Sequence, residues 1–187
     1  AAASIAQVHF AKLHSGEEVA VKILRPNIEK QIARDMQMFY WLAKIVERKN
    51  QRMKPFEVIA TLEETVKMEL DLRLESASAS LLKENFANWP GFYVPQIYWQ
   101  HVSQKVLVME KVSGIKIDDR EAIIAAGFSP DVILELAAKS LFKQVFDDGF
   151  FHADLHPGNV FVNNRGEIVP IDFGIMGQLD PKSRMYI

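Results

Sequence analysis

The sequence predicts an α+β fold with two lobes: a small lobe of antiparallel strands that contains two long helices, followed by the first part of a helical lobe. Two observations indicate this organisation. Strand-like stretches occur at residues 8–13, 19–23, 94–99 and 105–109, whereas apolar residues recur at helical spacing after residue 28 and again after residue 129. No low-complexity linker interrupts the chain, and we place the lobes at residues 1–110 and 111–187.

The composition limits the function. Of the 187 residues, 49% are hydrophobic and the net charge is −2, so the chain can bury a core and has no basic excess that would suit nucleic acid. Cysteine is absent, which excludes disulfides and thiolate metal sites. No apolar run reaches the roughly 20 residues that span a bilayer, and no signal peptide is visible. Because the chain has no basic excess, we expect no nucleic-acid partner.

The first element expected is a β-hairpin, which turns at residues 14–17. In its second strand, alternation places Ala20 and Lys22 on one face, while Val19, Val21 and Ile23 lie on the other.

Two long helices should follow, at residues 28–50 and 55–85. Their apolar rows have helical spacing and predict core packing. The rows are Ile28, Ile32, Met36, Phe39, Ala43 and Val46 in the first, and Ile59, Leu62, Val66, Leu70, Leu74, Ala77 and Leu81 in the second.

Two strands, at residues 94–99 and 105–109, should complete the small sheet, with Pro95 keeping the first of them near an edge. After residue 112, Ser129 is expected to cap a helix that Pro130 opens and that ends at Gly149.

Two motifs in the second half carry the chemistry. Residues 152–159 read HADLHPGN, and DFG follows at residues 172–174. Phosphoryl transfer needs a carboxylate near the attacking group, together with an amide oxygen and a second carboxylate on Mg²⁺. Asp154, Asn159 and Asp172 can take these roles. An aspartate in a loop is more often a turn or cap residue, but the two motifs have the order and spacing of protein kinases.

The N-terminal segment matches the phosphate-binding side of a kinase. The strand VAVK at residues 19–22 would place Lys22 at the α- and β-phosphates of ATP and Ala20 against the adenine. The first eight residues follow the kinase pattern G-x-G-x-x-G-x-V, with alanine at each glycine position, although such a stretch alone would indicate a frayed helix. The candidate nucleotide contacts here are Ala1, Ala3, Ser4, Ala6 and Val8.

Residues 109–112 fall where kinases connect their lobes. The Glu110 carbonyl and the Val112 amide would then pair with the adenine edge, and Met109 would lie behind it. The alternative is an ordinary edge strand that enters a glycine turn.

The second long helix should hold the acid that pairs with Lys22, and Glu75 is the candidate. Asp71 shares its helical face, whereas Glu69 lies about 200° around an ideal helix from Asp71. Glu69 and Asp71 therefore cannot converge on one ion without distortion. An exposed acidic face, with Glu69 paired to Arg73, is the alternative for Glu69.

Taken together, the alanine-rich loop, the Glu69-x-Asp71 motif, Glu75, VAVK, the HADLHPGN run and DFG resemble the UbiB family of atypical kinases, which function in ubiquinone biosynthesis. The resemblance covers essentially the whole chain. It implies Mg²⁺ and ATP as cofactors, and regulatory roles for Glu69 and Asp71 against a K-x-G-Q helix that this sequence lacks. Because the sequence begins inside the phosphate loop and stops just past DFG, we expect both of its ends to be truncated.

The resemblance also implies isoprenoid-quinone precursors and quinone-biosynthesis proteins as partners. Membrane association would occur through parts outside this sequence, at the cytoplasmic face of the bacterial inner membrane or in mitochondria or plastids.

Two departures from ordinary kinases bear on mechanism. Ala153 replaces the catalytic-loop arginine, which removes a docking site for an activation-loop phosphate. His156 replaces the lysine that follows the catalytic aspartate, so a permanent charge becomes conditional on pH. We count His156 with Asp154, Lys22 and Glu75 as the catalytic candidates. A small-molecule phosphotransferase of the aminoglycoside or choline kinase kind, and a pseudokinase scaffold that binds nucleotide, are the alternatives.

Overall fold

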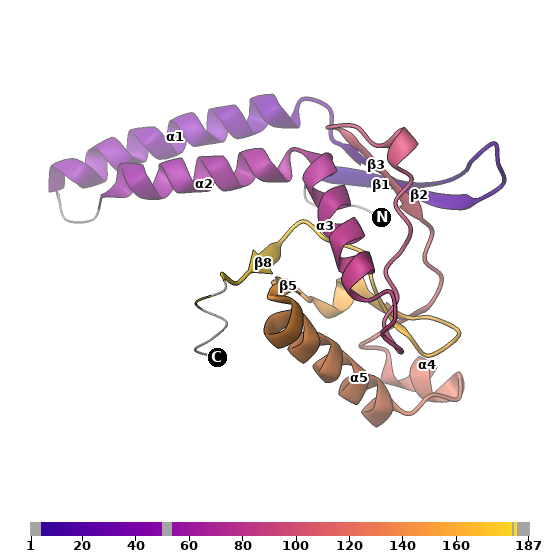
Figure 1. The fold of residues 1–187 in the computed structure, drawn as a ribbon. Coiled ribbons are helices and arrows are strands. Elements are labelled where there is room, and N and C mark those ends of the chain that lie inside the picture. Colours follow the sequence, from indigo (N-terminus) through magenta and orange to yellow (C-terminus); the bar gives the residue numbers. More distant parts are fainter. Residues whose placement is uncertain (1–4, 50–53, 181, 183–187) are drawn as a thin grey trace.

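A computed structural model of the chain describes residues 5–49, 54–180 and 182. Its small lobe contains a three-stranded antiparallel sheet in the order β1-β2-β3 (Figure 1). The strands are β1 (Ala6–Lys12), β2 (Glu18–Leu24) and β3 (Val106–Glu110). The register pairs Val8 with Lys22, and Ala20 with Met109. The predicted hairpin turn is confirmed: Gly16 has φ +107°, which glycine adopts without strain, and its amide bonds the Leu13 carbonyl at 2.9 Å.

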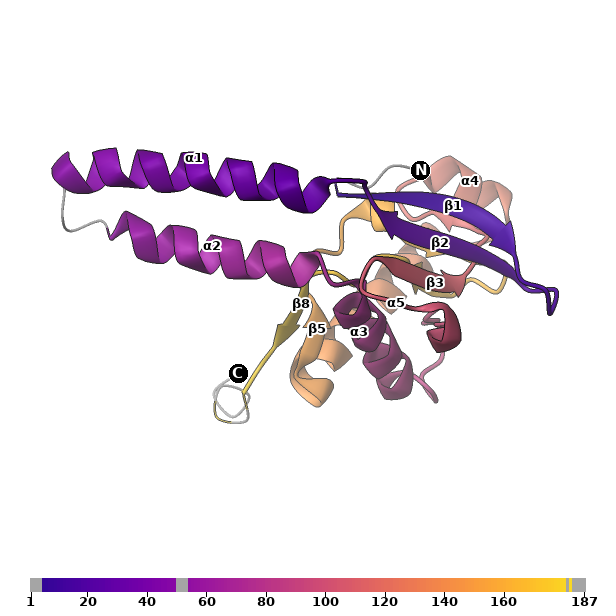
Figure 2. The same cartoon turned by 90° about the horizontal axis from the view of Figure 1, so that it is seen from above.

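Two antiparallel helices, α1 (Ile28–Lys49) and α2 (Pro55–Glu69), extend together away from the sheet (Figures 1 and 2). The first long helix therefore agrees with the prediction. Ile28, Met36 and Ala43 are buried along α1. The Tyr40 hydroxyl donates a hydrogen bond of 2.7 Å to Glu63 of α2, and the Tyr40 ring stacks on Phe56 at a centroid distance of 6.2 Å.

The prediction of one helix over residues 55–85 is wrong. The segment forms two helices instead: α2 ends at Glu69, and α3 (Leu72–Asn85) begins in a new direction (Figure 1). Asp71 has an extended backbone (φ −114°, ψ 93°), and its carboxylate accepts the Arg73 amide as a helix N-cap at 3.1 Å. Aspartate favours this position because its side chain satisfies an otherwise unpaired amide of the first turn. Apolar spacing alone did not reveal the break.

The strand predicted at residues 94–99 is also wrong in extent. Only an isolated bridge pairs Ile97 with Met109, and the chain then enters the 3₁₀ turn η2 (Trp99–His101). Pro95 has no amide to donate, so the segment cannot continue a regular ladder at its start. The second predicted strand, at residues 105–109, is present as β3.

The large lobe consists of helices and two small antiparallel sheets, in the orders β4-β6-β7 and β5-β8. Its elements are β4 (Ile115–Lys116), α4 (Arg120–Ala125), α5 (Pro130–Phe142), the π-helical turn η3 (Lys143–Asp148), β5 (Phe150–His152), η4 (Pro157–Asn159), β6 (Val160–Val162), β7 (Ile168–Pro170) and β8 (Met176–Gln178). Ser129 lies at the N-cap position of α5, but its side chain makes no capping hydrogen bond, contrary to the prediction. Gly149, with φ +65°, ends the helix as expected.

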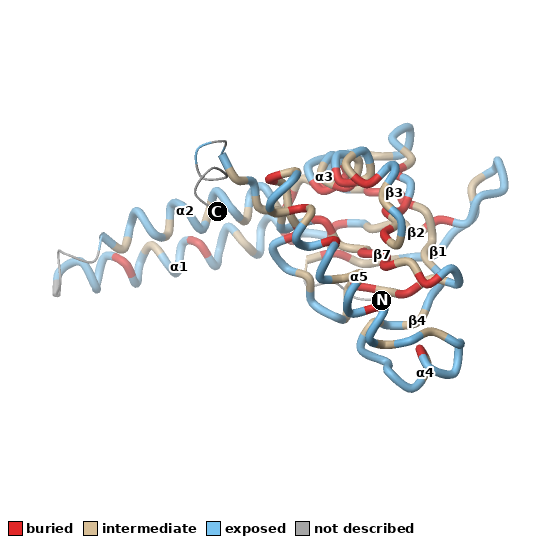
Figure 3. Tube along the Cα trace, turned by 60° about the horizontal axis from the view of Figure 1, so that its bottom comes forward, coloured by how far each residue is buried: buried red, intermediate tan, exposed pale blue. Residues whose placement is uncertain are grey.

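The buried residues concentrate in the two-lobed body, whereas most of α1 and α2 is exposed (Figure 3). One core cluster contains Leu107 and Met109 of the small sheet together with Val160, Ile168 and Phe173 of the large lobe. The division at residues 110 and 111 stays a prediction. Among the described residues, no helix has the length and apolar character needed to cross a membrane.

Candidate active site

A cleft of about 800 Å³ opens between the small-lobe strands, the α2–α3 junction and the loops of the large lobe. Eight of the seventeen predicted site residues line it. They are Val8, Lys22, Glu69, Asp71, Glu75, Asp154, Asn159 and Asp172. The fold thus gathers side chains that lie far apart in the sequence around one space.

Lys22 and Glu75 form the predicted ion pair inside this cleft. The Lys22 Nζ lies 2.8 and 2.9 Å from the two carboxylate oxygens of Glu75. Their side chains are only 15% and 6% exposed. Burial opposes the charge of the Lys22 ammonium, but the carboxylates of Glu75 and Asp172 outweigh this effect and raise its pKa. Lys22 therefore stays cationic at neutral pH.

The carboxylate of Asp172 completes a group of three charges. Its Oδ1 lies 3.4 Å from the Lys22 Nζ and accepts the Gly174 amide at 3.3 Å. Burial alone would raise the pKa of Asp172, but Lys22 and the Gly174 amide more than offset it, and the pKa is lowered. Burial raises the pKa of the Glu75 carboxyl, and Lys22 offsets this only in part. The Phe173 amide lies 3.5 Å from Glu75 Oε1, so the DFG segment, which contains Asp172, also contacts Glu75.

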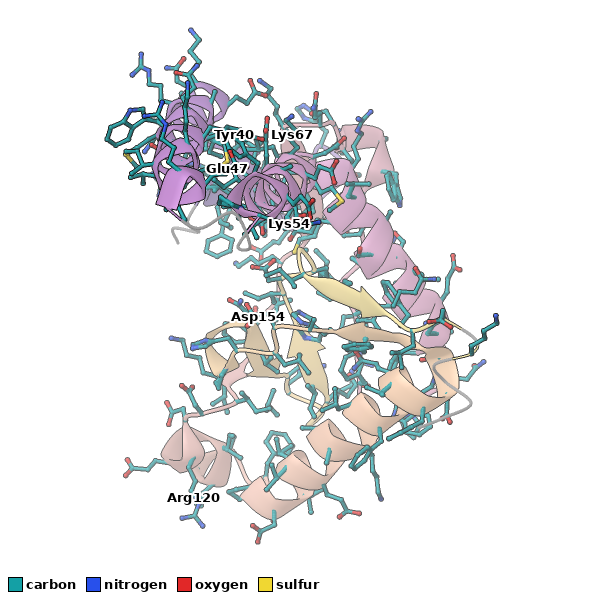
Figure 4. All side chains as sticks on the ribbon, turned by 90° about the vertical axis from the view of Figure 1, so that its left-hand side faces the viewer. Tyr40, Glu47, Lys54, Lys67, Arg120 and Asp154 are labelled. Atoms are coloured by element: carbon teal, nitrogen blue, oxygen red, sulfur yellow. The ribbon has the colours of Figure 1, made fainter. Side chains whose placement is uncertain are left out.

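The catalytic-loop motif begins at buried His152. Its Nδ1 accepts the amide of Asp154 at 3.1 Å, and its Nε2 bonds the carbonyl oxygen of Asp172. An acceptor at Nδ1 and a donor at Nε2 assign the neutral imidazole with its proton on Nε2. Asp154 is exposed, on the side of the large lobe that faces the α1–α2 hairpin (Figure 4). One imidazole thus links the catalytic loop to the DFG segment.

His156 does not line the cleft. Its Nδ1 accepts the Gly158 amide at 3.1 Å and caps the turn η4, while the side chain is exposed. The proposed catalytic role of His156 stays a prediction.

The phosphate loop is described only in part. Ala1, Ala3 and Ser4 lie outside the described residues. Ala6 is fully buried opposite Leu24, so it packs in the core, whereas Val8 lines the cleft.

The predicted adenine contacts do not line this cleft. Ala20 and Met109 pair across β2 and β3 in or against the core. Glu110 and Val112 line a second cleft of about 560 Å³. The Glu110 carboxylate accepts the Tyr93 hydroxyl at 2.6 Å, and burial together with this bond raises the pKa of Tyr93 to about 12. Backbone pairing of adenine with Glu110 and Val112 stays a prediction.

Glu69 and Asp71 both line the cleft, on either side of the break between α2 and α3. The helical angle that would have separated them does not apply across this break. Arg73 pairs with Asp71, at 2.6 and 2.9 Å, instead of with Glu69 as the alternative assumed. The Arg73 guanidinium lowers the pKa of Asp71.

Sequence reasoning missed one cation of the cleft. Lys116 of β4 lines it together with Asp154 and Asn159, and in the described part of the chain it forms no ion pair. A lysine two residues after Gly114, beyond the connection between the lobes, was the available signal.

The donor set fits magnesium. Within residues 5–49, 54–180 and 182, no group of three or more histidine, aspartate or glutamate side chains could hold a metal alone. Mg²⁺ in phosphotransferases takes one or two protein oxygens and completes its shell with water and substrate phosphates. Asp172 and Asn159, which both line the cleft, would hold it.

The fold and the arrangement of this cleft define a protein of the kinase-like class. The family model of the ABC1 atypical kinase-like domain matches residues 1–187, and the chain belongs to this family.

Individual proteins agree with this placement. The chain is 45% identical to the probable protein kinase UbiB of Marinobacter nauticus and 43% identical to that of Azotobacter vinelandii, in each case over 100% of this chain and 36% of the relative. It thus spans about a third of the length of these relatives. A solved structure, the complex of Rv3197 with erythromycin from Mycobacterium tuberculosis, is similar with a TM-score of 0.77 and 30% identity, over 95% of this chain and 45% of that one.

Proposed function

We propose that this chain is the nucleotide-binding core of an ATP-dependent phosphotransferase or ATPase of the UbiB type, which uses Mg²⁺ and supports isoprenoid-quinone biosynthesis. The observation that carries the proposal is the part-buried contact of Lys22 with Glu75 and Asp172, beside Asp154 and Asn159 in one cleft. The names of the UbiB relatives support the quinone pathway.

Each residue of the cleft would have a separate role in phosphoryl transfer. Lys22, kept cationic and oriented by Glu75, would neutralise the α- and β-phosphates of ATP. Asp172 and Asn159 would hold Mg²⁺, which supplies positive charge to the phosphates when it is bound. Asp154 would accept the proton of the attacking hydroxyl or water as the new O–P bond forms and the bond to the leaving ADP oxygen breaks. Lys116 would add positive charge beside Asp154.

The acceptor of the phosphoryl group distinguishes the candidate activities. Phosphate release by the full-length protein should be measured with ATP and Mg²⁺, with and without an isoprenoid lipid or a phenol. Stimulation of release supports the proposal. Transfer to an aminoglycoside or choline would favour the small-molecule phosphotransferase, and binding without turnover would identify a pseudokinase scaffold.

The partners and location are also part of the proposal. We infer quinone precursors and quinone-biosynthesis proteins as partners. Association with the cytoplasmic face of the bacterial inner membrane would involve other parts of the protein, with mitochondria or plastids as the alternative location. Co-sedimentation of the full-length protein with membranes of the host cell tests this location, and recovery only in the supernatant would contradict it.

A further inference from the structure

Helix α5 continues directly into a π-helical turn, η3, just before the catalytic loop. Within it, Lys143 pairs with both carboxylate oxygens of Asp148 at 2.7 Å, and both side chains are nearly buried. The Lys143 ammonium also lies over the rings of Phe86 and Trp89, at 4.8 and 5.7 Å from their centroids. The ion pair therefore joins the two ends of the turn, and Lys143 also contacts the residues that follow α3. Single π-helical turns within helices are frequent at functional sites.

Gln144 is the fully buried residue of this turn. Its Oε1 accepts the backbone amide of His152 at 2.9 Å. The partner identifies the oxygen, because an amide N–H can be satisfied only by an acceptor. Among the described residues, strand β5, which contains His152, pairs only with β8, and no second strand accepts amides on its other side. Gln144 supplies an acceptor there.

The hydrogen bond that Gln144 accepts from the His152 amide begins a connected series. His152 in turn accepts the amide of Asp154 and bonds the carbonyl of Asp172 through its two ring nitrogens. The oxygen of Gln144 is thus joined, through a single histidine, to the backbone of two residues that line the cleft. A shift of His152 would move both.

Packing does not explain a glutamine at this position. Its Nε2 is buried without a hydrogen-bond partner among the described residues. An unsatisfied buried donor is destabilising, and a methionine of similar shape would avoid that cost. What methionine could not supply is the acceptor for the His152 amide.

We propose that Gln144 is a positioning residue that holds His152, and through it the backbone at Asp154 and Asp172, in the geometry for phosphoryl transfer. The effect of Gln144 on turnover rests on the proposed function. Gln144 is fully buried and does not line the cleft, so its loss should slow turnover more than it weakens nucleotide binding.

The test compares Gln144→Met with Ser140→Ala in the full-length protein. Ser140 is a matched control because it lies one turn earlier in the same helix, is buried, and has a hydroxyl without a partner among the described residues. The measurements are amide hydrogen exchange at His152 and Asp154, the Kd for ATP with Mg²⁺, and kcat and KM for phosphate release.

We expect Gln144→Met to lower kcat by about tenfold or more with a Kd changed less than about threefold, because misplacement of reacting groups acts on the chemical step. The amide of His152 should exchange faster. Gln144→Glu, which keeps an acceptor oxygen, should restore most of its protection, and Ser140→Ala should match the parent in every measurement.

Equal exchange protection in Gln144→Met and Ser140→Ala would overturn the proposed contact, and equal kcat would overturn its role in turnover. If the parent releases no phosphate, the proposed function fails, while the exchange measurement still decides whether Gln144 holds His152. If Gln144→Met does not fold, Gln144→Asn takes its place, since it keeps the amide but withdraws it by one methylene.

Discussion

The cleft and the α1–α2 hairpin are built from opposite kinds of contact. In the cleft, Lys22 meets Glu75 and Asp172 across 53 and 150 residues of sequence, and the lysine and Glu75 are largely buried. The ion pairs along α2 join residues only three or four positions apart, as in Lys54 with Glu57 and Lys67 with Glu63, and mostly involve exposed side chains.

Helix α1 also differs from the cleft, because it exposes several large apolar side chains. Met38, Trp41, Leu42 and Ile45 follow one helical stripe and are 53%, 62%, 42% and 38% exposed. The buried residues of α1 lie on another part of the helix. The comparison teaches that tertiary contacts determine the cleft, whereas much of the hairpin depends on local helix formation. Substitutions in the two regions should therefore differ in cost.

The largest effect is expected at Glu75. Glu75→Ala leaves Lys22 in a nearly buried position without its main partner, and we expect a loss of about 3 kcal/mol in the free energy of unfolding. Lys22→Ala should have a similar effect, and the double variant should be little worse than either single one because the two residues act as a pair. Urea unfolding measures all three. Additive losses would show that the two side chains act independently.

A smaller effect is expected at the break between α2 and α3. Asp71→Ala removes the N-cap of α3 and should cost about 1 kcal/mol, whereas Asp71→Asn, which keeps a capping oxygen, should cost much less. Thermal or urea unfolding of both variants makes the comparison. Equal losses would mean that the ion pair of Asp71 with Arg73, and not the cap, stabilises this junction.

The pH dependence of stability should report on Asp172. Its pKa is lowered in the folded protein, so its contribution is present above the unfolded pKa near 3.8 and is lost as the pH falls through the folded value. The stability difference between the parent and Asp172→Asn should therefore stay constant near neutral pH and narrow only as the pH falls below the unfolded pKa, toward 3. Urea unfolding across this range is the measurement, and a constant difference would contradict the assignment.

The smallest effect is expected on the hairpin. Because Trp41 is 62% exposed, Trp41→Gln should change the free energy of unfolding by less than about 0.5 kcal/mol. The matched buried control is Leu82→Ala, which should cost about 3 kcal/mol because Leu82 is completely buried in α3. A loss of that size at Trp41 would show that the stripe on α1 is covered in the protein studied.

The two regions also differ in what could be predicted. The motifs predicted Lys22, Asp154, Asn159 and Asp172 as site residues from their kinase-like order and spacing, and the structure places all four around one cleft. The pairing of Lys22 with Glu75 followed from the need of a buried lysine for an acid. The first long helix followed from its apolar period.

Other features depend on contacts that periodicity does not encode. The apolar row continues past Asp71 to Leu81 without interruption. The break at Asp71 is therefore visible only in the capping bond and in the bond from the Leu72 amide to the Gln104 carbonyl, at 2.9 Å. Gln144 looked like an ordinary helix residue until the structure placed it against His152. Lys116 carried no motif, and its position depends on the pairing of β4 with β6.

The central claim is that the charges around Lys22 bind a magnesium nucleotide, and a thermal shift tests it most directly. ATP or ADP should raise the melting temperature of the full-length protein only when Mg²⁺ is present, because the ligand stabilises the folded state that it binds. Asp172→Asn should abolish this shift, whereas Asp118→Asn, an exposed aspartate outside the cleft, should leave it unchanged. A magnesium-dependent shift that persists in Asp172→Asn would contradict the account.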